Sequence, residues 1–173
     1  MSWADAGHEV AFGQKIYKKI PAFHASEKPI RVVHGKVNIG VKGEDFDCLF
    51  SMLSGGLVSY RYAGKEMIEK IPMPNFWRAP VDNDNGSMAP ARYAQWKIAS
   101  MYISHRNGGM FDNVPTKVEE KDNTVTVTYT YFMPTTPASK CQVAYTVFGD
   151  GTIETKLMYD PCLLYTSDAA DEA

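Results

Sequence analysis

Closely spaced cysteines and paired histidines are the first features that this chain of 173 residues lacks. The three cysteines are Cys48, Cys141 and Cys162. They stand too far apart for a C-x-x-C pair, which excludes a cysteine-based zinc cage and a disulfide scaffold. The four histidines are His8, His24, His34 and His105. No H-x-H or H-x-x-x-H spacing occurs among them, so a histidine-based metal site has no support.

An excess of one charge and long apolar runs are also absent. The 18 Lys and Arg residues nearly balance the 20 Asp and Glu residues, giving a formal charge of −2. The chain therefore has no basic field that would attract nucleic acid or an anionic membrane surface. No stretch approaches about 20 consecutive apolar residues, which is the length that a membrane span needs. We expect neither nucleic acid nor membrane as a partner.

Aromatic residues are plentiful, at 12% of the chain, and aromatic residues favour β-sheets. Apolar and polar residues alternate over many short runs that are separated by turn residues, a pattern typical of an all-β sandwich or barrel. We predict up to ten strands, at residues 8–16, 30–41, 46–53, 57–62, 66–71, 98–105, 117–121, 124–133, 142–148 and 152–159. In the run 124–133, period-2 spacing places Val125, Val127, Tyr129 and Tyr131 on one face.

One segment breaks this rhythm. Residues 72–90 hold four prolines and several Asp and Asn residues, which predicts a long irregular loop of the kind that carries function. Its Phe76 and Trp77 argue against disorder. Residues 90–99 then look helical, because Pro90 suits a first helical turn and Trp96 follows Tyr93 at i+3.

The densest polar cluster of the chain, residues 78–86, allows three interpretations. Asp82, Asp84 and Gly86 imitate part of a calcium loop, but the glycine is one position early and Tyr93 stands where a bidentate Glu is needed. In an extended chain, Asp82 and Asp84 would point the same way about 6–7 Å apart, as a pair of glycosidase carboxylates could. Spacing alone favours a third interpretation, in which Asp and Asn side chains bond their own backbone and hold a tight loop.

A family resemblance rests on this cluster and its surroundings. Residues 74–86 read PNFWRAPVDNDNG, which resembles the P-x-F-x-R-A-P-x-D-N-D-x-G block of the large LacZ-type β-galactosidases of glycoside hydrolase family 2. Residues 50–57 resemble the F-x-x-x-S-G-x-L hairpin that begins the family's C-terminal domain, and Trp96-Lys97 matches its following W-K. Residues 3–11 resemble the W-x-x-A-G-H-x-x-A strand that closes its preceding domain.

The resemblance implies a domain organisation. Residues 1–20 would be the last strand of an immunoglobulin-like domain four, and residues 21–29 a linker. Residues 30–161 would be the first half of the small-chain domain, a partial β-supersandwich of the galactose-mutarotase-like kind. Residues 162–173 resemble the translation of a sequencing adapter, and we expect them to be a non-native tail.

The resemblance also implies a function. The chain would be part of a β-galactosidase that hydrolyses terminal non-reducing β-D-galactosides with retention. The two catalytic Glu residues and the magnesium and sodium ligands of the family would lie outside this chain, which would hold no catalytic residue, metal or cofactor of its own. The substrate-pocket loop would comprise Arg78, Asp82, Asn83, Asp84 and Gly86, with Gly86 as the hinge of a mobile loop at the pocket mouth.

The expected partners are therefore a β-galactoside and the barrel-bearing remainder of the protein, which we expect to be a homo-oligomer, cytoplasmic rather than periplasmic. Two rival interpretations stay open. The chain could be a stand-alone carbohydrate-binding β-sandwich, in which aromatic residues stack on a sugar without catalysis. It could also be an aldose-epimerase-like enzyme with the same kind of fold, but the scattered histidines supply no matching motif.

Overall fold

The computed structural model describes residues 13, 15, 26, 28–105 and 116–160. The strands are β1 Arg31–His34, β2 Asn38–Lys42, β3 Phe46–Ser51, β4 Gly56–Tyr62, β5 Lys65–Glu66, β6 Lys117–Lys121, β7 Thr124–Met133, β8 Ser139–Val147 and β9 Ile153–Asp160. The helices are α1 Asp82–Gly86, α2 Ala89–Arg92 and α3 Ala94–Tyr102. Most of the predicted strand at 8–16, most of the end of domain four at 1–20, most of the linker at 21–29 and all of the tail at 162–173 lie outside the described residues.

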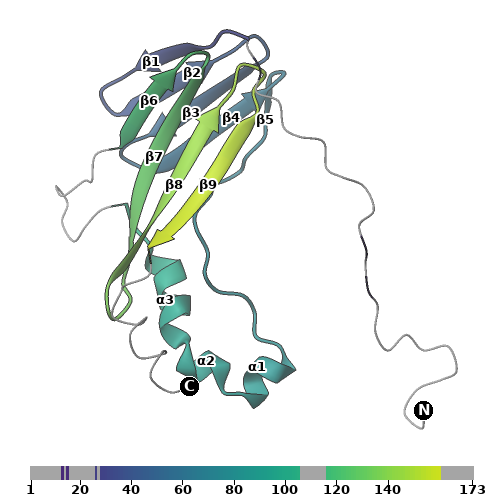
Figure 1. Ribbon diagram of the computed structural model, residues 1–173, viewed down its shortest axis with the longest axis vertical. Helices are drawn as coiled ribbons and strands as arrows, with labels where there is room; N and C mark the ends of the chain where they lie inside the picture. The colour runs from purple at the N-terminus through teal and green to yellow at the C-terminus, as the bar shows by residue number, and fades with distance from the viewer. Residues whose placement is uncertain (1–12, 14, 16–25, 27, 106–115, 161–173) are drawn as a thin grey trace, which may run out of the picture.

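Two antiparallel sheets make up most of the described chain, which confirms the all-β prediction. The first sheet has the order β1-β2-β3-β4-β5 and the second the order β6-β7-β8-β9. Figure 1 shows the sheets packed face to face as a sandwich, with the three helices beyond one of its ends. The completion of this sandwich into a larger supersandwich stays a prediction.

The first predicted run, residues 30–41, is two strands rather than one. His34 pairs with Ile39 across a turn in which the Gly35 N–H donates to the Asn38 carbonyl at 2.8 Å. The turn holds an even number of residues, and residues paired across it share a face, so the buried positions change phase from Val32 in β1 to Ile39 and Val41 in β2. The predicted run kept a single phase through Val33, which is exposed, and therefore passed over the turn. The run at 66–71 is also shorter than predicted, because only β5 pairs with β4.

The second sheet follows the predicted alternation closely. Every second residue of β7 is buried, including the four residues that the pattern placed on one face. The turn before β7 has Asp122 in the left-handed region, at φ 52°, a conformation that Asp tolerates better than most residues. The hairpin from β8 to β9 turns through Gly151, at φ 89°, as its glycine-rich sequence indicated.

The core lies between the two sheets and is joined across by aromatic rings and hydroxyl groups. Phe50 from β3 and Tyr145 from β8 have ring centroids 5.7 Å apart. The Tyr131 hydroxyl donates to the Gly55 carbonyl at 2.7 Å, and burial raises the pKa of this phenol above its ordinary value. This hydrogen bond satisfies two polar groups that burial would otherwise penalise, and it helps to fix how one sheet sits on the other.

Two cysteines are part of the same core. Both Cys48 and Cys141 are buried and free, and burial raises the pKa of their thiols to about 12 and about 11. They remain protonated at neutral pH and pack as small apolar residues.

The segment between the sheets is more helical than predicted. Residues 98–105 were expected to form a strand, but most of them belong to α3, so that prediction is wrong. The segment follows the helical period of 3.6 residues, because Trp96, Ala99, Ser100 and Ile103 share one partly buried face. The other apolar residues of the run obscured this period in the sequence. Only Ser104 pairs with a strand, exchanging backbone hydrogen bonds with Phe132.

The loop predicted at 72–90 likewise contains α1 and the start of α2, whose Pro90 stands in the first turn as expected. None of the described helices is long and apolar enough to cross a membrane.

Candidate functional site

The candidate site is built on the segment that leaves the first sheet after β5 and runs without regular structure to α1 (Figure 1). The Phe76 N–H donates to the Ser100 hydroxyl on α3 at 2.8 Å. The rings of Phe76, Trp96 and Tyr159 lie 5.7–6.1 Å apart, centroid to centroid, in tilted and edge-on arrangements that aromatic rings prefer. This three-ring cluster anchors the segment to both α3 and β9.

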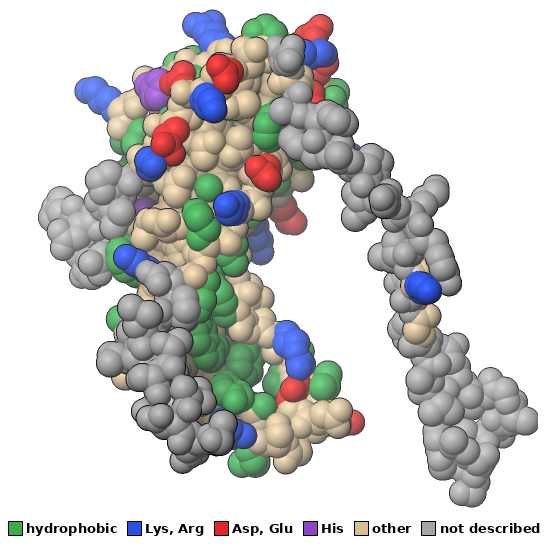
Figure 2. Space-filling model, viewed as in Figure 1, with side chains coloured by type: hydrophobic (Ala, Val, Ile, Leu, Met, Phe, Trp, Pro, Cys, Tyr) green, Lys and Arg blue, Asp and Glu red, His purple; other side chains and the backbone are tan. Residues whose placement is uncertain are grey.

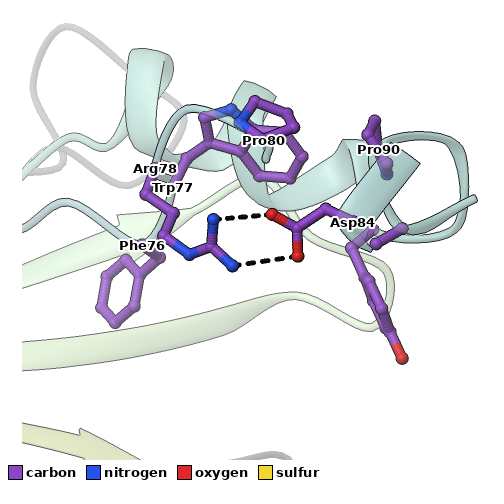
Figure 3. A pocket seen from close by; sticks show the side chains of 8 residues that line it. Phe76, Trp77, Arg78, Pro80, Asp84 and Pro90 are labelled. Atoms are coloured by element: carbon purple, nitrogen blue, oxygen red, sulfur yellow. Dashed lines mark hydrogen bonds and ion pairs between the residues drawn. The ribbon is translucent and has the colours of Figure 1, made fainter. Parts of the chain in front are cut away.

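Arg78 and Asp84 then close the segment on itself (Figure 3). The two guanidinium nitrogens Nη1 and Nη2 lie 2.6 and 2.9 Å from the two carboxylate oxygens of Asp84, a bidentate pair. The Oδ2 atom of Asp84 also accepts the Val81 N–H at 2.8 Å. The guanidinium, followed by this N–H, lowers the pKa of Asp84 below its ordinary value. The carboxylate is therefore charged and engaged by its own loop.

The bond to Val81 explains how α1 begins. Val81 is the N-cap residue of α1, and its side chain has no atom that can accept a hydrogen bond. Asp84, three residues later, supplies the other half of a capping box by accepting the Val81 N–H. A helix of five residues with no buried residue has little stability of its own, so the ion pair and this cap define its conformation.

A pocket of about 160 Å³ opens beside this pair (Figure 3). Aromatic rings and prolines make up most of its lining, and the ion pair supplies its charged groups. The lining residues are Phe76, Trp77, Arg78, Pro80, Asp84, Ala89, Pro90 and Tyr93. Apolar walls with a few oriented polar groups are typical of sites for small organic ligands.

The structure divides the five residues that the sequence predicted for the substrate-pocket loop. Arg78 and Asp84 line the pocket, whereas Asp82, Asn83 and Gly86 are exposed and do not line it. Gly86 ends α1 without a positive φ, and an added Cβ there would meet no atom within 4 Å. Residues other than glycine can adopt this backbone conformation, so it does not require a glycine at position 86. The role of Gly86 as a hinge stays a prediction.

The predicted geometry of the two acidic residues is corrected. Asp82 and Asp84 lie in α1 rather than in an extended chain, and helix residues two apart do not face each other. They are therefore not arranged as a facing carboxylate pair. The interpretation in which acidic side chains bond their own loop is confirmed for Asp84.

Sequence reasoning missed two parts of the pocket wall. The sequence placed neither Trp77 nor Tyr93 in the substrate pocket, and both line it. A signal was present, because Trp77 lies within the proline-rich loop and Tyr93 directly follows it. Among the described residues, no group of three or more His, Cys, Asp or Glu side chains could hold a metal ion, in a calcium loop or otherwise.

The fold and the pocket together define an all-β sandwich protein with a ligand-sized site on the segment between its sheets. Residues 42–168 match the family described as Beta galactosidase small chain, which is well over half of the chain. The chain belongs to this family. The match runs past residue 161, where we expect the native sequence to end, and that expectation stays a prediction.

Full-length relatives show how much of a protein this chain represents. It is 41% identical to a β-galactosidase of Clostridium acetobutylicum and 44% identical to one of Halalkalibacterium halodurans, each over 159 residues. These alignments cover 91% of this chain but only 17% and 15% of the two relatives. A β-galactosidase small subunit of Latilactobacillus sakei is 35% identical over 146 residues, covering 78% of this chain and 46% of that subunit.

Proposed function

We propose that this chain belongs to a β-galactosidase acting on terminal β-D-galactosides, in which the segment 74–93 forms one wall and a loop of the galactoside pocket. The observation that carries the proposal is the pocket itself, which joins aromatic and proline surfaces to an oriented ion pair. The relatives named β-galactosidase support the reaction. The remainder of the protein, which we expect to form a homo-oligomer, would supply the other walls.

The lining suits a sugar. A pyranoside has an apolar C–H face and a rim of hydroxyl groups, so it needs an aromatic surface and hydrogen-bond donors together. Trp77 and Tyr93 supply rings, and Arg78 supplies N–H donors. Pro80 and Pro90 stiffen the loop around them, because proline restricts the backbone.

The catalytic carboxylates are proposed to come from outside this chain. Hydrolysis with retention needs two carboxyl groups about 5–5.5 Å apart across the scissile bond, one as nucleophile and one as acid and base. Asp84 is held by Arg78 and Val81, and Asp82 does not line the pocket. Magnesium and sodium would likewise be held elsewhere, since the described residues offer no cluster of ligands for them.

A chimera tests this proposal. The aligned segment of the Halalkalibacterium halodurans β-galactosidase is replaced by the corresponding residues of this chain, and hydrolysis of an aryl β-D-galactoside is measured. We expect the chimera to be active and Tyr93→Ala to lower its kcat/KM roughly three- to tenfold, the loss of about 0.5–1.5 kcal/mol of ring contact. Tyr93 caps α3 without a side-chain hydrogen bond, so removing its ring leaves the helix start intact.

Tyr102 provides the matched control. It is likewise an exposed tyrosine, at the other end of α3, and does not line the pocket, so Tyr102→Ala is expected to leave kcat/KM within twofold. Equal losses from both variants, or no loss from Tyr93→Ala, would contradict the proposed wall.

The isolated chain separates this proposal from a stand-alone binding module. We expect the purified 173-residue chain to show no galactosidase turnover, because the described residues that line the pocket offer no facing pair of carboxylates. Measurable turnover would overturn this assignment of the catalytic residues. Galactose binding by the isolated chain at millimolar concentrations, followed by tryptophan fluorescence, would instead favour the carbohydrate-binding module.

A further inference from the structure

The hydrogen bonds of Arg78 leave part of its guanidinium unused. The group carries five N–H donors in a fixed plane. Its Nη1 atom donates to Asp84 and to the Ala79 carbonyl, at 2.6 and 3.1 Å, and its Nη2 atom donates once to Asp84. Within the described part of the chain, the Nε–H and one Nη2 N–H make no further hydrogen bond. The side chain is 67% exposed, so these donors are accessible.

Asp84 is in the opposite situation. Its side chain is only 23% exposed, and both of its oxygens already accept hydrogen bonds from Arg78, with Val81 adding a third. A carboxylate in this state has little capacity left for a ligand. Its geometric effect is to fix the plane in which the guanidinium lies, since a bidentate pair allows one orientation.

We propose that Arg78 binds a hydroxyl group of the galactoside through its two remaining N–H groups, and that Asp84 is the positioning residue that orients it. This inference rests on the proposed function and adds a division of roles within the pocket. Arg78 contacts the substrate, whereas Asp84 acts only through Arg78 and the start of α1.

The charge of the pair selects the class of ligand. An unpaired arginine in a pocket favours phosphate or carboxylate groups. Here the carboxylate of Asp84 neutralises the guanidinium at contact distance, so the pair carries no net charge toward the pocket. A neutral sugar hydroxyl therefore fits the remaining donors better than an anionic substituent does.

Deoxygenated substrates test the contact directly. In the active chimera, Arg78→Ala is assayed with an aryl β-D-galactoside and with its 2-, 3-, 4- and 6-deoxy analogues. We expect Arg78→Ala to raise KM about tenfold for the full substrate, with kcat within twofold, because a hydrogen bond to a charged donor is lost. For one deoxy analogue, the one that lacks the contacted hydroxyl, the same substitution should change KM less than twofold.

Asp84→Asn tests the positioning role. The amide keeps an acceptor for the Val81 N–H but loses the charged pair, so the guanidinium is no longer oriented. We expect Asp84→Asn to raise KM for the full substrate. For the deoxy analogue that lacks the contacted hydroxyl, the same substitution should change KM less than twofold, as in Arg78→Ala. The matched controls are Asp45→Asn and Arg61→Ala, which change exposed residues that do not line the pocket and should leave KM within twofold.

The possible outcomes separate this inference from the proposed function. Equal KM losses for all five substrates in Arg78→Ala would mean a structural role only and would overturn the hydroxyl contact. Unchanged deoxy selectivity in Asp84→Asn would overturn the positioning role. If Tyr93→Ala impairs the chimera but Arg78→Ala does not, the pocket wall stands and this inference fails. If neither variant has an effect, the proposed function itself fails.

Discussion

The sandwich and the segment that joins its two sheets are stabilised in different ways. In the sandwich, residues alternate between buried and exposed along the strands, and apolar side chains from both sheets meet in one core. In the joining segment, α1 and α2 bury no residue at all. The conformation of the joining segment depends on a few contacts, chiefly the Arg78–Asp84 pair and the three-ring cluster.

Because of this contrast, substitutions in the sandwich should change stability, whereas substitutions in the joining segment should change contacts with a ligand. A core built by packing loses stability when volume is removed, whereas a loop defined by a few polar contacts changes shape without unfolding the protein. Figure 2 shows charged side chains scattered over the sandwich, while hydrophobic side chains gather toward the helical end. The joining segment is the part in which a substitution can change recognition and leave the fold in place.

The largest effect is expected in the core. Phe50→Ala removes a fully buried ring that contacts Tyr145 across the sandwich, and should lower the free energy of unfolding by about 3–5 kcal/mol. Leu49→Ala, the neighbouring and partly exposed position, should cost about 0.5 kcal/mol. Urea unfolding of the 173-residue chain measures both. Similar losses at the two positions would contradict the packed-core description.

A smaller loss is expected from one buried hydroxyl. Tyr131→Phe leaves the Gly55 carbonyl without its donor and should lower the free energy of unfolding by about 1–3 kcal/mol. The control is Tyr62→Phe, at an exposed position at the end of β4, for which no measurable change in the free energy of unfolding is expected. The urea midpoints of the two variants are compared with that of the unchanged chain. An unchanged midpoint for Tyr131→Phe would show that the hydroxyl does not hold the sheets together.

In the joining segment we expect a local effect instead of a global one. Asp84→Asn should leave the urea midpoint unchanged but speed amide hydrogen exchange at Asn85, whose N–H donates to the Val81 carbonyl, about tenfold. Asp82→Asn makes the same charge change in the same helix without touching the ion pair. Equal exchange rates in the two variants would mean that the pair does not define α1.

The smallest effect is a shift of one titration. Because the pKa of Asp84 is lowered in the folded chain, the ion pair is fully present above the unfolded aspartate value of about 3.9 and is lost as pH falls through the lower folded value. Carboxyl chemical shifts should therefore show Asp84 titrating below about pH 3.9. Replacing Arg78 by Ala should raise its midpoint, and a midpoint at the ordinary value with Arg78 intact would contradict the pairing.

Local patterns predicted the sandwich better than the segment beside it. The burial of β7 and the turn at Asp122 follow from period and turn chemistry that neighbouring residues determine. The helix at 98–102 was missed because Ile98 and Tyr102 favour strands, whereas Ala99 is buried in the core and Ser100 accepts a hydrogen bond from the distant Phe76. Likewise, the engagement of Asp84 by Arg78 depends on the backbone turning between them, which residue spacing does not encode.

The three-ring cluster has a consequence for the order of folding. Phe76 meets Tyr159 across more than eighty residues of chain, so the contact closes one of the longest loops in the described structure. During synthesis, the segment that carries the pocket emerges well before β9, its anchor. The pocket wall therefore cannot be completed before β9, which carries Tyr159, has been synthesised.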